Sequence, residues 1–370
     1  MPDRYTGLLH FDPMPTSIPH AGLTLRRHFI TLLLTGFVAS SAWAQVQGGA
    51  GALPELKLSV AQSPAFPLGK AAERWAALVN ETAARNFNVK LYPGVTLSGR
   101  DPAREFGALK DGLADMAVGS ALAWSAQFPS AGVYTLPWLA PETSQQEALV
   151  ANVALLDLVA RRAVFADVVV LAVAAAGDRV LATAKNPVRT PTEAAGLRVR
   201  VPGVPVAIDT FAALSAQPQS LDFAAAQSAF MAGTLDGQDA LPTALAAQRI
   251  TAVGQRVVTR WGAFADAMIF AVRRPVWDGW PEAQRTAVRA AAVLAAREAQ
   301  AIAREDTALA ELVKQGVTVV TLSSVQRAAF RAAVQNVWVK WTPAIGPELV
   351  AAAEAAVASA VAAGALRPAP

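Results

Sequence analysis

Residues 105–120 read EFGALKDGLADMAVGS, and this stretch decides the fold class. The pattern predicts a helix, a glycine stop at Gly112 and a short apolar strand that ends at Ser120. Upstream, alternating apolar residues predict strands at 56–61 and 88–93, with helical spacing between them. Strands that alternate with helices indicate parallel α/β layers rather than an all-helical or all-β protein.

The helix expected between the first two strands, at 69–84, has Trp75 and Val79 four residues apart on one face. Apolar runs predict four further strands, at 168–176, 180–183, 197–201 and 317–322. The longest helical segment runs from Pro281 to Gln315. A continuous helix of this length would reach ~50 Å and could brace two domains. Two helices broken near Thr307 are the alternative.

The first 44 residues have the features of an export signal. Arginines 26–27 precede an apolar run that ends in the small-residue triplet AWA at 42–44, which predicts cleavage before Gln45. The paired arginines fit a twin-arginine signal and also the basic region of a general secretory signal, so both routes stay open. Met1 and Met14 are alternative starts.

The composition excludes several kinds of active site. All three histidines, His10, His20 and His28, lie in the export segment, and the chain has no cysteine. After residue 44, His- or Cys-dependent nucleophiles and zinc sites are therefore impossible. Asp236 and Asp239 are the only obvious clustered acids, and turn formation and capping explain their spacing better than catalysis does. The net charge of +4 comes without a basic run, so no nucleic-acid surface is expected.

The stretch GLRVRVPG at 196–203 raises the question of ligand binding. Arg198 and Arg200 alternate with apolar residues, and Arg200 lies at the carboxyl end of the strand. Ligand crevices of α/β sheets lie at that end, and the planar guanidinium matches a carboxylate. Arg198 lies deeper, so a solvated or inter-element charge is expected there. The alternative is that both arginines decorate an exposed face.

Four stretches, in this order, resemble the solute-binding subunits of tripartite ATP-independent periplasmic (TRAP) transporters, the DctP-like family. They are RDPAREFGALKDGLADMAVGSALAWSAQFPSAGVYTLPWL at 100–139, GLRVRVPG at 196–203, MAGTLDGQDALPTALAAQRITAV at 231–253 and VRRPVWDGWPEAQRTAVRAAA at 272–292. The resemblance covers essentially all of the chain after the export segment. It implies a two-lobed α/β protein, with a long helix across both lobes, that closes on a small organic acid.

The resemblance also implies a periplasmic binding protein without enzymatic activity or cofactor, which presents its ligand to the membrane subunits of a transporter. An extracytoplasmic sensor for an organic acid is the alternative. The expected division is a signal at 1–44, a linker at 45–54, lobe I at 55–176 plus about 266–305, and lobe II at 177–265 plus about 306–370.

In this family the arginine at the position of Arg200 pairs with the ligand carboxylate, and the arginine at the position of Arg179 approaches it. Further expected ligand contacts are Phe223, Trp124, Ser120, Gln238 and Asp239. Core packing is the competing interpretation for Phe223 and Trp124, and a surface charge for Arg179.

The pocket departs from the family pattern in several places, since the charged side chains that binders of polyhydroxylated acids have around Ser120 and Ala123 are missing. Ala240 and Ala225 stand where many relatives have Asn and Glu. Because a buried ligand hydroxyl without a partner costs affinity, a heavily hydroxylated sugar acid is disfavoured. We expect a monocarboxylate with a mostly apolar or aromatic remainder.

Overall fold

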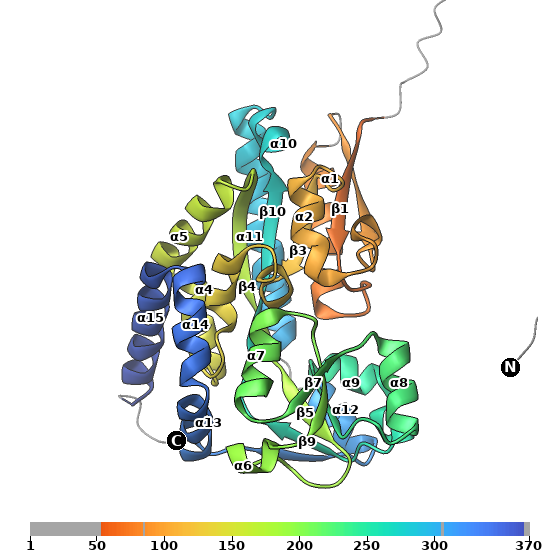
Figure 1. The fold of residues 1–370 in the computed structure, drawn as a ribbon. Helices are drawn as coiled ribbons and strands as arrows, with labels where there is room; N and C mark the ends of the chain where they lie inside the picture. The colour runs from red at the N-terminus through yellow and green to blue at the C-terminus, as the bar shows by residue number, and fades with distance from the viewer. Residues whose placement is uncertain (1–52, 84–85, 305–306, 366–370) are drawn as a thin grey trace, which may run out of the picture. The chain divides into compact units, whose positions relative to one another are not determined.

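The computed structural model describes residues 53–83, 86–304 and 307–365, which belong to one compact unit. The expected signal at 1–44 lies outside the described residues. Within the described part of the chain, the strands form two mixed sheets, A and B, with helices packed around them (Figure 1). The α/β class predicted from the sequence is confirmed.

Sheet A has its strands in the order β2 (Asn88–Pro93), β1 (Glu55–Val60), β3 (Met116–Ser120), β10 (Ala265–Arg273) and β4 (Val168–Asp178). β1 is parallel to β2 and β3, whereas β10 is antiparallel to β3 and β4. The sequence predicted β1, β2 and β4 to within two residues at each end, because their apolar side chains recur with the spacing of a buried strand.

Sheet B has its strands in the order β11 (Thr318–Thr321), β9 (Val257–Arg260), β5 (Val180–Thr183), β8 (Gly237–Ala240), β6 (Arg198–Val201) and β7 (Gln217–Ser220). β6 is parallel to β7 and β8, and β5 is antiparallel to β8 and β9. Arg179 is the single residue between β4 of sheet A and β5 of sheet B. The chain therefore passes from one sheet to the other at this arginine.

The α-helices of the first half are α1 (Pro67–Ala83), α2 (Glu105–Lys110), α3 (Ala121–Trp124), α4 (Thr143–Ala151) and α5 (Val153–Val164). Those of the second half are α6 (Pro191–Ala194), α7 (Pro205–Ala213), α8 (Phe223–Met231), α9 (Pro242–Gln248), α10 (Arg274–Asp278), α11 (Glu282–Arg304), α12 (Thr307–Lys314), α13 (Ser324–Ala333), α14 (Gln335–Ile345) and α15 (Pro347–Ala365).

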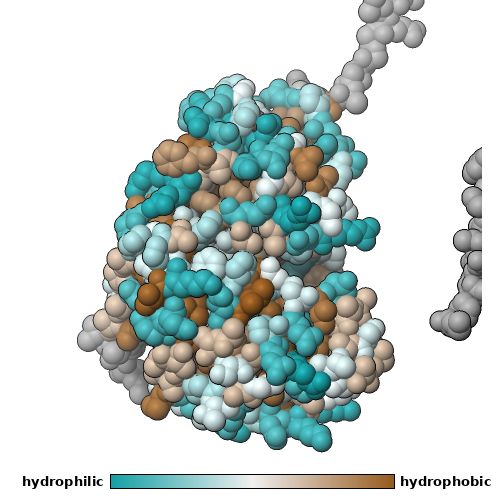
Figure 2. All heavy atoms as spheres, in the orientation of Figure 1, coloured by the Kyte–Doolittle hydropathy of each residue, from teal (hydrophilic) through white to brown (hydrophobic). Residues whose placement is uncertain are grey.

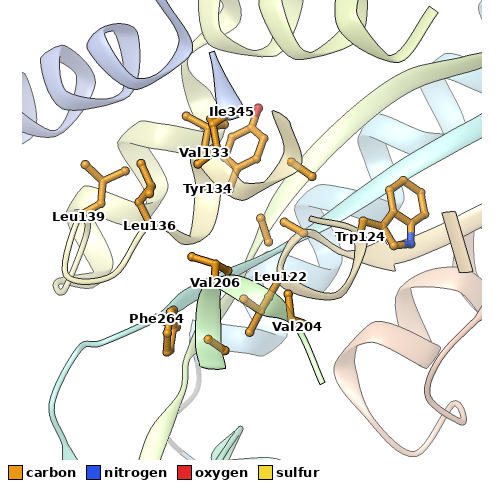
Figure 3. Packing of buried hydrophobic residues seen from close by; sticks show 14 of the residues in the cluster. Leu122, Trp124, Val133, Tyr134, Leu136, Leu139, Val204, Val206, Phe264 and Ile345 are labelled. Atoms are coloured by element: carbon orange, nitrogen blue, oxygen red, sulfur yellow. The ribbon is translucent and has the colours of Figure 1, made fainter. Parts of the chain in front are cut away.

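One core lies between sheet A and the helices α1 and α11. Trp75 and Val79 of α1 are both fully buried in it, as their spacing predicted. The Trp75 ring meets Phe270 of β10 edge-on, with 5.5 Å between ring centroids. A second core joins Leu122, Val206 and Ile345, from segments far apart in the sequence (Figure 3).

The expected long helix appears as α11 and α12. α11 packs against α1 and β4 of sheet A, and α12 packs against α9 and β11 on the side of sheet B. The segment 282–314 therefore contacts both lobes, as predicted. Residues 305–306 lie outside the described residues. The lobe boundaries themselves stay a prediction.

The C-terminal helix α15 is the one helix in the described ranges that is long and apolar enough to cross a membrane by length and composition, over Pro347–Gly364. It packs against α4 and α5, and Leu349 and Ala353 are fully buried there. Glu354 interrupts its outer face, as expected for a surface helix. On the face of the molecule drawn in Figure 2, hydrophilic and hydrophobic residues are interspersed.

Candidate ligand-binding site

Arg179 lies at the point where the two sheets meet, and its side chain is 8% exposed. Its backbone N–H donates to the carbonyl of Phe264, just before β10, at 2.9 Å. Its guanidinium donates from Nε to Asp239 Oδ1 at 2.5 Å and from Nη2 to the Asp239 carbonyl at 2.9 Å. The arginine is therefore fixed to β8 through its side chain and to the start of β10 through its backbone.

Asp239 is fully buried in the centre of sheet B, where it lies opposite Leu181 of β5. Burial raises the pKa of its carboxyl, and the nearby charges of Arg179 and Arg200 counteract this. Only Oδ1 is bonded to Arg179, and Oδ2 is buried without a hydrogen-bond partner among the described residues. Asp239 Oδ2 is therefore able to accept a hydrogen bond that no described residue donates.

Arg200 lies at the end of β6 and is partly buried. Its Nε donates to the carbonyl of Leu221 at 3.1 Å, and no described carboxylate forms an ion pair with it. Burial lowers the pKa of Arg200, as does the positive charge of Arg179, while Asp239 and Asp222 act in the opposite direction. A partly buried guanidinium without an ion pair is suited to an anionic ligand.

Arg198 has a different environment from Arg200. Its Nε and Nη2 donate to the two oxygens of Asp236 at 2.9 and 2.7 Å, and Nη2 also donates to the carbonyl of Gly233. It is therefore paired with the residue just before β8, an inter-element charge as the sequence predicted. The two arginines of one strand differ because only the deeper one meets a carboxylate.

Ser120 and Asp266 form the sheet A side of the site. Ser120 Oγ donates to Asp266 Oδ2 at 2.6 Å and accepts from the N–H of Ala123, so that it caps α3. Asp266 is 4% exposed. Burial raises the pKa of its carboxyl, and the Ser120 hydrogen bond and the Arg179 charge oppose this rise. Asp266 therefore lies within electrostatic reach of Arg179 from the other sheet.

The sequence analysis missed Asp266. The available signal was a lone carboxylate in the otherwise apolar strand ADAMIFAVR at 265–273, since a buried Asp needs a partner or a function. Its main partner, Ser120, is 146 residues away in the sequence. No local pattern could have joined the two.

Trp124 is fully buried, and its ring belongs to the core of Figure 3. Its Nε1 donates to Glu105 Oε2 at 3.1 Å, and its ring meets Phe106 edge-on. A Cβ added at Gly119 would lie 1.9 Å from the indole, so this glycine makes room for the ring. Packing, the competing interpretation, describes Trp124 in this structure, where its side chain offers no exposed surface to a ligand.

Gln238 and Phe223, which were also predicted to contact the ligand, have environments different from that of Trp124. Gln238 is 2% exposed, and its Nε2 donates to Gln255 Oε1 at 2.8 Å in a buried amide pair. Phe223 begins α8, and its side chain lies outside the described residues. Of the predicted contacts, the structure brings Arg179, Arg200 and Asp239 into one electrostatic cluster.

A cavity of about 450 Å³ is lined by residues from both sheets, including Gln62 after β1, Met268 of β10 and Leu241 after β8. Asp178 and Val180 line it but Arg179 between them does not, as expected for alternating side chains. Arg200 and Asp239 do not line it either, so this cavity is separate from the arginine cluster. No cluster of three or more metal-ligating acids occurs in the part of the chain that the structure describes.

Comparisons with known proteins identify the family of the chain. The family described as "Bacterial extracellular solute-binding protein, family 7" (DctP) matches residues 58–343. The chain belongs to this family. A TRAP periplasmic solute-binding protein from Ralstonia eutropha H16, solved with bound (S)-2-acetolactate, is 38% identical and has a TM-score of 0.77. The alignment covers 82% of this chain and 99% of that one.

Two more distant relatives extend the comparison. The C4-dicarboxylate-binding periplasmic protein DctP of Rhodobacter capsulatus is 29% identical over 48% of this chain. The match spans 54% of the length of that relative. A TRAP solute-binding protein from Shewanella oneidensis, solved with succinate, is 22% identical, with a TM-score of 0.73 and coverage of 83% and 100%. This protein is therefore a periplasmic, non-enzymatic solute-binding protein, as the sequence resemblance implied.

Proposed function

We propose that this solute-binding protein captures a small monocarboxylic acid through Arg200 and Arg179 and delivers it to the membrane subunits of a TRAP transporter. The observation that supports this most directly is the state of Arg200, a partly buried guanidinium with one hydrogen bond to a carbonyl and no ion pair among the described residues. A carboxylate placed here would gain charge-assisted hydrogen bonds and would supply the missing counter-charge.

Arg179 would play the second role. Its Nε and Nη2 are engaged by Asp239, which leaves Nη1 without a hydrogen bond in the described part of the chain. Because the other two nitrogens are fixed, an Nη1 contact to the ligand would require little further ordering of the side chain. Arg200 would thus supply most of the binding and Arg179 the orientation.

Ala240, buried next to Asp239 in β8, has no polar side chain, which supports a modest ligand remainder with few hydroxyl groups. The Ralstonia relative binds acetolactate, a monocarboxylate with one hydroxyl and one keto group. Acids of that size and polarity fit better than polyhydroxylated ones, because a buried hydroxyl needs a partner.

A thermal-shift screen of the chain from Gln45 would test the proposal, with acetolactate, other keto acids, aliphatic and aromatic monocarboxylates and sugar acids. A saturating ligand raises the melting temperature by mass action. We expect a small monocarboxylate to stabilise the wild type and the Arg200→Gln variant to lose at least about 90% of the affinity, since truncating one partner of a desolvated pair is costly.

The matched control is Arg198→Gln, which removes an arginine from the same strand but one already paired with Asp236. This variant should bind as the wild type does. Equal stabilisation of the wild type and Arg200→Gln by the same acid would refute the assignment of Arg200, and a tightly bound sugar acid would refute the apolar remainder.

A further inference from the structure

A groove of about 680 Å³ runs along the outer face of α11, and no residue of the arginine cluster described above lines it. The opposite face of this helix is buried against sheet A and α1. The lining of the groove includes three arginines of α11, Arg285, Arg289 and Arg297, and a single acid, Glu282. The described lining therefore carries an excess of positive charge.

Neighbouring acids balance only one of these three charges. Glu282 lies 2.9 Å from Arg285 Nη2 and is itself largely exposed. Glu298 follows Arg297 in the sequence, but its two oxygens accept from Arg74 of α1 at 2.8 and 3.2 Å. The carboxylate of Glu298 is thus engaged outside the groove, and the charge of Arg297 is not neutralised by it.

Arg289 is held in position from α10. Its guanidinium lies over the ring of Trp277, 5.1 Å from the ring centroid. A guanidinium stacked on a ring keeps its N–H groups in the plane, where they can donate to a carboxylate. Arg289 and Arg297 are both exposed, and neither forms an ion pair with a described residue. Two positive charges are therefore presented to solvent along the groove.

The shape of the groove follows from the order of side chains on α11. Residues four apart on a helix form ridges, and a second helix packs its own ridge into the groove between two of them. One ridge carries the three arginines with an aliphatic residue among them: Arg285, Arg289, Val293 and Arg297. The neighbouring ridge is low where Thr286 and Ala290 are small, and it rises at Leu294, which is 43% exposed. At ~1.5 Å per residue the arginine ridge extends over ~18 Å, the length of about three helical turns.

We infer that this groove is a docking site for an acidic amphipathic helix of a partner protein. Carboxylates on that helix would pair with Arg289 and Arg297, and an apolar side chain between them would pack on Leu294. A second copy of this chain is a poor occupant, because a two-fold contact through this face would place arginines opposite arginines. A flat membrane surface would not enter a groove between two ridges. The site does not involve Arg200, so it is independent of the proposed ligand.

The test uses a synthetic alanine-based helix of about 20 residues with a leucine stripe flanked by glutamates, which is long enough to span the arginine ridge. Its binding to the chain from Gln45 is followed by fluorescence anisotropy at about 20 mM and about 150 mM salt, since salt screens exposed charges. We expect this peptide to bind the wild type at least about tenfold more tightly than its glutamine counterpart. The double variant Arg289→Glu/Arg297→Glu should abolish the difference.

Three controls separate the groove from general charge. Lys185→Glu/Arg189→Glu makes the same change in net charge at two exposed residues after β5 and should bind as the wild type does. Leu294→Ala keeps every charge and should weaken binding about threefold or more at both salt concentrations, because the apolar contact is lost. A version of the peptide with prolines in its interior keeps the glutamates but cannot form the helix, and it should bind at least about tenfold more weakly.

The outcomes decide between the possible occupants. The inference is overturned if the glutamate and glutamine peptides bind alike, if both double variants lose binding equally, or if the proline version binds as tightly as the helix. Vesicles of equal parts phosphatidylglycerol and phosphatidylcholine represent the membrane as a partner. If the wild type binds these vesicles through Arg289 and Arg297 and does not bind the peptide, the groove is a membrane contact and the inference is wrong.

Discussion

Glu105 offers a test of the structure that does not depend on any ligand. The side chain is fully buried beneath α3, where Oε1 accepts from Ser59 Oγ at 2.8 Å and Oε2 accepts from Trp124 Nε1 at 3.1 Å. Burial raises the pKa of this carboxyl from its ordinary 4.5 to about 7, and the two hydrogen bonds only partly oppose the rise. The Glu105 carboxyl is therefore protonated more readily in the folded protein than in the unfolded chain.

The pH dependence follows from this shift. Well below pH 4.5 the group is protonated in both states and does not reduce the free energy of unfolding. As the pH rises, the unfolded chain ionises first, so the free energy of unfolding falls until the folded group ionises near pH 7. A shift from 4.5 to about 7 corresponds to about 3 kcal/mol in total, most of which is lost between pH 5 and pH 8.

Glu105→Gln should remove this loss. The amide is neutral at every pH, and it can accept from Trp124 Nε1 through its oxygen and donate to Ser59 Oγ through its nitrogen. We expect the difference in unfolding free energy between pH 5 and pH 8, measured by urea denaturation of the chain from Gln45, to change by about 2–3 kcal/mol in favour of pH 8.

Glu348→Gln is the control, because the pKa of this exposed carboxyl is lowered rather than raised, first by its own backbone N–H and then by Arg162. Its contribution to stability is present above its ordinary pKa and is lost as the pH falls, the opposite direction to that of Glu105. If wild type and Glu105→Gln lose the same free energy between pH 5 and pH 8, the carboxyl is not desolvated as the structure indicates, and the reasoning fails.

Two further predictions concern packing. Gly119→Ala places a methyl group 1.9 Å from the Trp124 ring, so we expect destabilisation by about 1–3 kcal/mol or more and a lower melting temperature, whereas a wild-type melting temperature would show that the ring moves freely. Trp75→Ala empties the core between α1 and sheet A and should cost about 3–5 kcal/mol by urea denaturation, and a loss below 1 kcal/mol would contradict the packing against Phe270.

The sequence predicted the elements better than the site, for a physical reason. Strands such as β4 and helices such as α1 are encoded by periodic side chains within a dozen residues, and Trp75 with Val79 is an example. The pairing of Arg198 with a neighbouring segment was also predictable from its deeper position on the strand, whereas ligand contact by Arg200 stays a prediction.

The environment of the predicted site residues was not encoded locally. Trp124, for which ligand contact and core packing were both open, is enclosed by Glu105 and Phe106, and only the glycine at 119 indicates the space that the ring needs. Asp266 obtains its raised pKa from burial between elements that are distant in the sequence. Burial and long-range partners arise from tertiary packing, so a single sequence carries little signal for them.

Under the proposed function, ligand capture and the closure of the two lobes depend on different residues. Arg200 lies on sheet B, and the guanidinium of Arg179 is held by β8 of the same sheet, so a ligand bound by these two guanidinium groups alone would favour neither an open nor a closed form. A ligand shifts an equilibrium only through contacts that differ between the two states. Those contacts must come from sheet A, where Ser120 and Asp266 cap the start of α3. We therefore expect substitutions at Arg200 to abolish binding and substitutions at Ser120 to weaken closure while capture persists.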